Sequence, residues 1–142
     1  MTKQIIQFIQ NHWMLCSASM LVLALLLFEE IRGKITGMPK ISVQDTVLSL
    51  NREKAIVIDL RNQTAFSSGH ILGAINIARA DIDHNLKKLE PHKNQDLILV
   101  DDTENDVSSV GSKLQNSGFI KVYVLAGGLN SWKDAQLPLS KN

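Results

Sequence analysis

One short segment of the chain gathers most of the side chains that could do chemistry. We call residues 101–106 the acidic loop, and they read Asp101-Asp102-Thr103-Glu104-Asn105-Asp106. Carboxylate and hydroxyl oxygens bind Mg²⁺, and an aspartate can act as a nucleophile, so one interpretation is a magnesium-dependent site that processes phosphate groups. The simpler interpretation is that these acids are solvated or cap the helix that follows, and Asp106 is well placed as such a cap.

Apolar residues flank the acidic loop with two different spacings. Residues 97–100 form a continuous apolar run, which is typical of a strand buried on both faces of a parallel sheet. After the loop, helical spacing is seen at Val107, Val110, Gly111 and Leu114. Gly118 suits the left-handed end of that helix. The loop is therefore predicted to join the carboxyl end of a strand to a helix amino terminus, where α/β proteins commonly bind ligands.

The charge of the acidic loop argues against a free anionic substrate. Its four acids give a formal charge of −4, and the loop itself holds no Lys, Arg or His to offset them. An anion would meet like charges and could gain only backbone donors. We expect the Asp101 carboxylate to lie at the mouth of the loop, near the free N–H groups of the following helix.

Composition removes several classes of function. Cys16 is the only cysteine in the 142 residues, so an intramolecular disulfide and a cysteine-based metal cluster are excluded, and the globular part holds no thiol. The four histidines (His12, His70, His84 and His92) lack the spacing of metal ligands, and neither a metal nor a cofactor is predicted. The 15 basic residues nearly balance the 14 acidic ones without a basic patch, so nucleic acid is not a predicted partner.

The rest of the chain alternates apolar runs with amphipathic segments. Strands are predicted at residues 55–60, 74–77 and 122–125, and helices at residues 42–50, 81–89 and around Trp132. Such alternation is typical of an α/β fold in which helices cover both faces of a parallel sheet. We therefore predict one globular domain over residues 40–142 that folds alone.

The amino-terminal part lacks charge over an unusual length. Residues 4–28 are 25 uncharged residues in succession, whereas a helix needs about 20 residues to cross a bilayer. The alternatives are a cleaved signal peptide or a buried core helix, but the run ends without a processing site of small residues. We predict a transmembrane anchor over residues 1–30 and a juxtamembrane linker over residues 31–39.

Basic residues at the flanks of this span give it an orientation. Lys3 and the terminal amine precede it, and Arg32, Lys34 and Lys40 follow it. Because positive charge is retained on the cytoplasmic side, the carboxyl-terminal domain is expected in the cytoplasm.

Three separated motifs resemble those of the rhodanese family. They are residues 57–61 (VIDLR), residues 66–77 (FSSGHILGAINI) and residues 125–132 (LAGGLNSW). The resemblance covers residues 40–138 and implies a rhodanese-like parallel sheet, and the single helix ahead of the domain is similar to bacterial inner-membrane rhodanese-like proteins. Rhodaneses transfer sulfur through a cysteine persulfide, and the family's cysteine corresponds here to Asp101. A carboxylate cannot form a persulfide, so the family reaction is chemically unavailable.

The motifs also supply residues with predicted structural roles, which are Asp59, Arg61, Gly69, His70, Gly73, Gly127, Gly128 and Trp132. Asp59 and Arg61 project to the same side of a strand end, where they either order the neighbouring loops or form an ordinary surface pair. His70 is interpreted as a hydrogen-bonded structural residue, because no nucleophile is available for it to activate. The glycines suit tight turns, and Trp132 suits the core.

These observations favour a catalytically inactive rhodanese-like module that is held at the inner (cytoplasmic) membrane and binds another membrane or cytoplasmic protein. Two alternatives stay open: a sulfur-transfer role in which a partner supplies every thiol, and the carboxylate and Mg²⁺ site described above. Changing Asp101→Cys alone is expected not to restore thiosulfate transfer, because the other loop acids repel the substrate and no basic residue replaces them.

Overall fold

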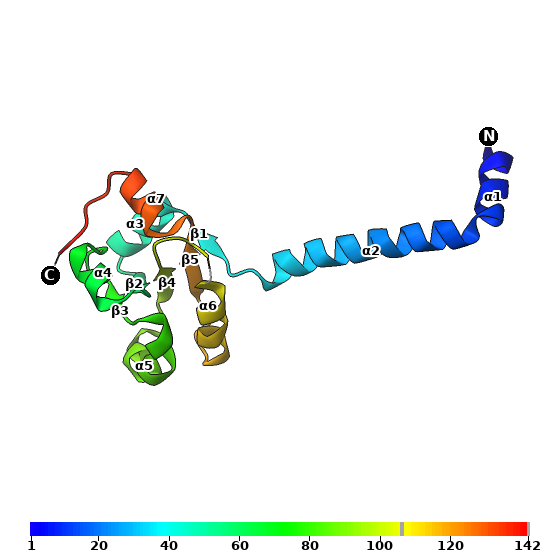
Figure 1. Ribbon diagram of the computed structural model, residues 1–142. Coiled ribbons are helices and arrows are strands. Elements are labelled where there is room, and N and C mark those ends of the chain that lie inside the picture. Colours follow the sequence, from blue (N-terminus) through cyan, green and yellow to red (C-terminus); the bar gives the residue numbers. More distant parts are fainter. Residues whose placement is uncertain (106, 142) are drawn as a thin grey trace. The chain divides into compact units, whose positions relative to one another are not determined.

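The computed structural model describes residues 1–105 and 107–141, with residues 31–36 described at the level of the backbone. The chain forms two compact units, Met1–Gly37 and Met38–Asn142. The first unit consists of two helices, α1 (Thr2–Asn11) and α2 (Trp13–Thr36), which are drawn separately in Figure 1.

The break between α1 and α2 differs from the single helix predicted over residues 4–28. His12 has φ −125° and ψ 34°, outside helical geometry, and both Asn11 and His12 are weaker helix formers than Ala or Leu. Over Trp13–Glu30, α2 is long and apolar enough to cross a membrane, by length and composition. It continues to Thr36, so most of the segment predicted as a linker is helical.

The second unit is built on a sheet of five parallel strands in the order β1-β5-β4-β2-β3. The strands are β1 (Lys40–Ile41), β2 (Ala55–Asp59), β3 (Ile75–Asn76), β4 (Asp96–Val100) and β5 (Val122–Leu125). The predicted strands are present, and β1 is an addition that the sequence did not signal because it has only two residues. Lys40 of β1 pairs with Val124 of β5, which brings the start of the domain to the edge of the sheet.

Helices cover both faces of this sheet, as predicted (Figure 1). They are α3 (Val43–Asn51), α4 (Gln63–Ser68), α5 (Ile82–Leu89), α6 (Val107–Asn116) and α7 (Gly128–Asp134), with short 3₁₀ turns η1 (Arg79–Asp81) and η2 (Glu90–His92). One core cluster contains residues of α5 and α6, and the other contains residues of α3 and α7. The domain is therefore a three-layer α/β fold with a core on each side of the sheet.

The central strand β4 shows why the fold follows from the sequence. Leu97 and Leu99 belong to one core cluster, whereas Ile98 and Val100 belong to the other. Successive side chains of a strand point to opposite faces, so a strand buried on both faces needs an unbroken apolar run. Because β4 is the central strand, the acidic loop that follows it begins in the middle of one edge of the sheet, at the carboxyl ends of the strands.

Helix boundaries also agree with local signals in the sequence. Ser42 caps α3 by accepting a hydrogen bond from the Asp45 N–H, as the predicted capping arrangement requires. In α6 the four residues found at helical spacing are all buried. Gly118 has φ +95°, the left-handed conformation expected after that helix.

Candidate functional site

The acidic loop connects β4 to α6 and meets three cations from distant parts of the chain. Arg79 donates a hydrogen bond to Oδ2 of Asp101. Nη1 of Arg61 lies 3.5 Å from Oδ1 of Asp102. The Lys40 ammonium donates to Oε1 of Glu104 at 2.8 Å.

The loop itself holds no base, as the sequence shows, but the expectation that only backbone donors are available at it is wrong. It counted only bases inside the loop, whereas the sheet brings in Arg61 from the end of β2, Arg79 from η1 and Lys40 from β1. The sequence did contain a signal for two of these three cations, Arg61 and Arg79. Arg61 follows β2 and Arg79 follows β3, and the carboxyl ends of parallel strands meet at one edge of a sheet.

The Asp101 carboxylate has a different environment from the one predicted. Its Oδ1 accepts a hydrogen bond from the Asp102 N–H at 2.7 Å, and its Oδ2 accepts one from Arg79. Both partners lie outside α6, and within the described residues this carboxylate is therefore bound by an arginine and by a neighbouring backbone N–H. Asp106, predicted to cap α6, lies outside the described residues. Thr103 and Asn105 are exposed.

The backbone of the acidic loop is hydrogen-bonded to the start of α7. The Leu129 N–H donates to the Asp101 carbonyl at 2.8 Å, and the Asn130 N–H donates to the Asp102 carbonyl at 3.2 Å. Gly127 donates its N–H to Oε2 of Glu104 at 3.0 Å. The hydrogen bond from Lys40, followed by that from Gly127, lowers the pKa of Glu104.

The two glycines of the last motif make this close approach possible. Gly127 and Gly128 have φ +73° and +63°, a region that side chains with a Cβ rarely adopt. A Cβ on Gly128 would lie 2.7 Å from the Asp101 carbonyl oxygen. The turn predicted at these glycines thus packs directly against the backbone of the acidic loop.

Asp59 and Arg61 form a buried ion pair rather than the surface pair considered from the sequence. Their side chains are only 1% and 6% exposed, with Nη2 of Arg61 2.7 Å from Oδ2 of Asp59. The same Nη2 donates to the Gly69 carbonyl at 2.7 Å. Burial acts to lower the pKa of Arg61, but the hydrogen bond and charge of Asp59, with smaller contributions from Asp102 and Asp101, outweigh it and raise that pKa.

His70 is held by hydrogen bonds and stacking. Its Nδ1 donates to the Phe66 carbonyl at 2.9 Å, its ring stacks on Phe66 at 3.8 Å between centroids, and its backbone pairs with Ser140. Gly73, in the same motif, has φ +78°. Trp132 is buried, and its Nε1 donates to the Pro138 carbonyl at 3.2 Å.

The described residues contain no group of three or more His, Cys, Asp or Glu side chains placed to hold a metal ion. In the acidic loop the carboxylates of Asp101, Asp102 and Glu104 face three different cations. This arrangement does not favour the magnesium interpretation.

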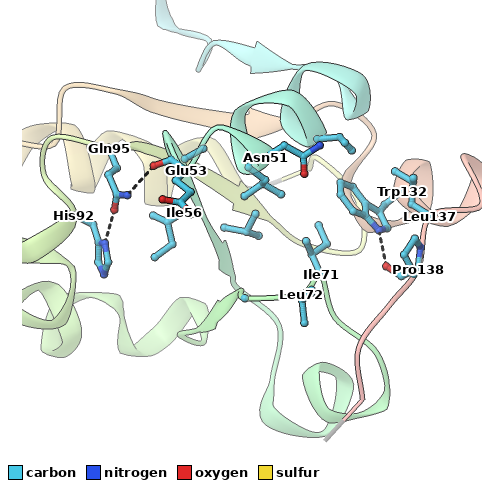
Figure 2. A pocket seen from close by; sticks show the side chains of 15 residues that line it. Asn51, Glu53, Ile56, Ile71, Leu72, His92, Gln95, Trp132, Leu137 and Pro138 are labelled. Atoms are coloured by element: carbon cyan, nitrogen blue, oxygen red, sulfur yellow. Dashed lines mark hydrogen bonds between the residues drawn. The ribbon is translucent and has the colours of Figure 1, made fainter.

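A hollow of about 530 Å³ lies elsewhere in the domain, and sequence reasoning did not identify it. Figure 2 shows its wall, with Ile71 and Leu72 on one side and Trp132 and Pro138 at one end. Ala55, Ile56 and Val57 of β2 all line it, although their side chains alternate between the two faces of the sheet. The hollow therefore opens at the edge of β2, where β3 pairs only with Ile58 and Asp59. None of the described residues of the acidic loop lines it.

The fold and the three motifs together define a rhodanese-like domain. The chain matches the Rhodanese-like domain family over residues 42–135 and belongs to that family. It is 31% identical to the uncharacterized protein YibN of Escherichia coli strain K12 over 138 residues, which cover 96% of each chain.

Two further relatives are a thiosulfate sulfurtransferase and a rhodanese-like domain of known structure. Thiosulfate sulfurtransferase GlpE of Pseudoalteromonas translucida is 32% identical over 97 residues, which cover 67% of this chain and 89% of GlpE. The solution structure of the rhodanese-like domain of the Anabaena Alr3790 protein is 26% identical and aligns with a TM-score of 0.62 over 75% of this chain and 81% of that chain.

Proposed function

We propose that this chain is a membrane-anchored rhodanese-like domain that does not transfer sulfur and acts by binding another protein. The observation that supports a lack of sulfur transfer is Asp101, which the resemblance places at the position of the family's cysteine and which pairs with Arg79. Forming a persulfide requires a thiolate, and a carboxylate cannot replace it. The only cysteine, Cys16, lies in α2, outside the domain.

The surroundings of Asp101 also support the proposal, because they oppose binding of an anionic substrate. The three cations near the acidic loop, Arg61, Arg79 and Lys40, already contact carboxylates. The Gly127 N–H is bonded to Glu104. To reach these cations, an anionic sulfur donor would have to displace the loop carboxylates. The fold holds those carboxylates beside the cations, so their effective concentration there is high. Substrate binding is therefore opposed even where a cation is present.

Anchoring by α2 completes the proposal. Its 18 residues Trp13–Glu30 are long and apolar enough to cross a membrane, by length and composition, although the last two are glutamates, and no side chain of that stretch is buried by the protein. We place it in the inner (cytoplasmic) membrane, with the domain in the cytoplasm because Arg32, Lys34 and Lys40 follow the span. The partner is then another membrane protein or a cytoplasmic protein.

The activity part of the proposal is tested with the full chain in detergent, with thiosulfate as the sulfur donor and GlpE of Pseudoalteromonas translucida as the active control. We expect no transfer above a heat-denatured sample for the wild type or for Asp101→Cys. In Asp101→Cys, Asp102 and Glu104 would still pair with Arg61 and Lys40, and Glu104 would still accept the Gly127 N–H. These groups would therefore not be free to bind thiosulfate. Transfer by the wild type would overturn the proposal. Transfer by Asp101→Cys at the rate of GlpE would show that only the nucleophile is missing.

The binding part is tested by crosslinking in cells, followed by capture of the full chain. The controls are a chain without residues 1–30 and a chain consisting of residues 1–37 alone. We expect a defined protein to be captured with the full chain, less of it without the anchor, and none with the anchor alone. Equal capture by the anchor alone would show that the domain does not provide the contact.

A further inference from the structure

The two amino-terminal helices differ in how their apolar residues are distributed. In α1, at about 100° per residue, Ile5, Ile6, Phe8 and Ile9 fall on one side. The opposite side carries only polar residues, which are Lys3, Gln4, Gln7, Gln10 and Asn11. In α2 the run Leu21–Phe28 is apolar on every side. A one-sided helix suits a boundary between lipid and water, whereas an apolar surface on every side suits the lipid interior.

The apolar face of α1 has no cover within the described residues. Its four large side chains are between 48% and 62% exposed, and none of its residues is buried. Removing apolar surface from water is favourable in proportion to its area, so four such side chains on one side of a helix favour contact with an apolar surface.

The break at His12 separates α1 from the membrane span. The 18 residues of Trp13–Glu30 rise about 27 Å at 1.5 Å per residue, and spans of about 17–25 residues cross a bilayer. α2 is thus long enough to cross without α1. Trp13 begins α2, and tryptophan concentrates at the membrane interface.

The polar groups of the two helices agree with this division. In α2, Ser17 donates its hydroxyl to the Met14 carbonyl at 3.0 Å and Ser19 donates to the Leu15 carbonyl at 2.9 Å. These bonds within the helix remove the cost of placing the hydroxyls in hydrocarbon. The glutamines of α1 have no comparable partner among the described residues, and their amides would be costly in the bilayer core.

We propose that α1 lies in the plane of the membrane surface, with Ile5, Ile6, Phe8 and Ile9 in the lipid boundary, and that α2 alone crosses the bilayer. Lys3 is the only charged side chain of α1, and residues 1–28 contain no acid, so the helix fits a surface of phosphate headgroups. The proposal rests on the proposed anchoring by α2.

The experiment uses the full chain reconstituted in vesicles of phosphatidylglycerol and phosphatidylcholine. Single cysteines are introduced in a Cys16→Ala background, at Gln4→Cys and Gln7→Cys on the polar side and at Ile5→Cys and Ile9→Cys on the apolar side. A charged maleimide is loaded on both faces of the membrane, so that the orientation of the chain does not affect the result. The wild type, whose only cysteine is Cys16, reports on the span.

We expect the two polar positions to be labelled at least about tenfold faster than the two apolar ones, because the interface exposes only one side of the helix. Protection of all four positions would place α1 inside the span, and equal fast labelling of all four would place it in water; either result overturns the proposal. Cys16 is expected to be protected. Fast labelling of Cys16 in intact vesicles would instead refute the anchoring by α2, which distinguishes the two failures.

Discussion

The acidic loop and the hollow beside β2 lie in the same domain but differ in how their polar groups are used. In the loop, Asp101, Asp102 and Glu104 each contact a cation from another element, and two loop carbonyls accept N–H bonds from the start of α7. The hollow is lined mainly by apolar side chains. Its polar contacts in Figure 2 are few, and they join residues of its own wall, such as Trp132 to Pro138.

Two glycines, Gly128 against the acidic loop and Gly73 in the wall of the hollow, make the difference in packing between the two regions measurable. A Cβ on Gly128 would meet the Asp101 carbonyl oxygen at 2.7 Å, whereas a Cβ on Gly73, in the wall of the hollow, would meet nothing within 4 Å. Both residues have positive φ. The backbone of the acidic loop is therefore held against the turn before α7, whereas the hollow beside β2 leaves open space at Gly73.

The largest effect is expected for Arg61→Ala, which removes the cation between Asp59 and the acidic loop. Because it leaves the Asp59 carboxylate buried and unpaired, the free energy of unfolding should fall by about 3–5 kcal/mol. The measurement is urea denaturation of a fragment that begins at Met38, since this residue packs in the domain core.

Lys113→Ala is the matched control for this variant. It also removes one partner of an ion pair, but Lys113 and Asp83 are 54% and 59% exposed, and such a pair is worth about 0–1 kcal/mol. Equal losses in the two variants would show that the buried pair of Asp59 and Arg61 contributes no more to stability than an exposed ion pair.

A smaller effect is expected for Gly128→Ala. The positive φ costs about 1–2 kcal/mol for a residue with a Cβ, and overlap with the loop carbonyl adds about 1–3 kcal/mol of packing strain. Gly73→Ala has the first cost without the second. The difference between the two unfolding free energies therefore measures the packing beneath the loop, and a difference near zero would contradict the contrast between the two regions.

The fold could be predicted because its strongest signals are local. Residues 97–100 of β4 form an unbroken apolar run, and α6 has four buried residues at helical spacing. The break at His12 could not be predicted, because residues 4–28 are all uncharged and contain neither of the helix-breaking residues Gly and Pro. A stretch of two residues such as β1 is also too short to carry a strand pattern.

The candidate site was harder to predict because its partners are distant in sequence. Arg79 is 22 residues before Asp101, and Lys40 is 64 residues before Glu104. The acids themselves were visible as one cluster, but their charge balance depends on strand order, which places β1 beside β5 and β2 beside β4. Local patterns identified which residues make up the loop, and only the topology identified what they contact.

The smallest expected effect concerns Glu104, which joins β1 to the turn before α7. Its pKa in the folded chain is lowered below the ordinary value of 4.5 by the hydrogen bond from Lys40 and that from Gly127. A carboxyl with a depressed folded pKa stabilises the protein above its unfolded pKa, and this contribution is lost as the pH falls through the folded pKa. The Glu104 side chain is 33% exposed, so solvent screening limits the contribution to less than about 1 kcal/mol.

Glu104→Gln should therefore lower the free energy of unfolding slightly at pH 7, and the gap from the wild type should close on acidification below pH 4.5. The amide of glutamine can still accept the Gly127 N–H, so the gap reports on the charge paired with Lys40. The measurement is a series of urea denaturations between neutral and acid pH, with Asp83→Asn as the control because Asp83 pairs with Lys113 at an exposed site. A gap that widens as the pH falls would mean that Glu104 is destabilised as an anion, and the contact from Lys40 would then fail to offset the neighbouring acids of the loop.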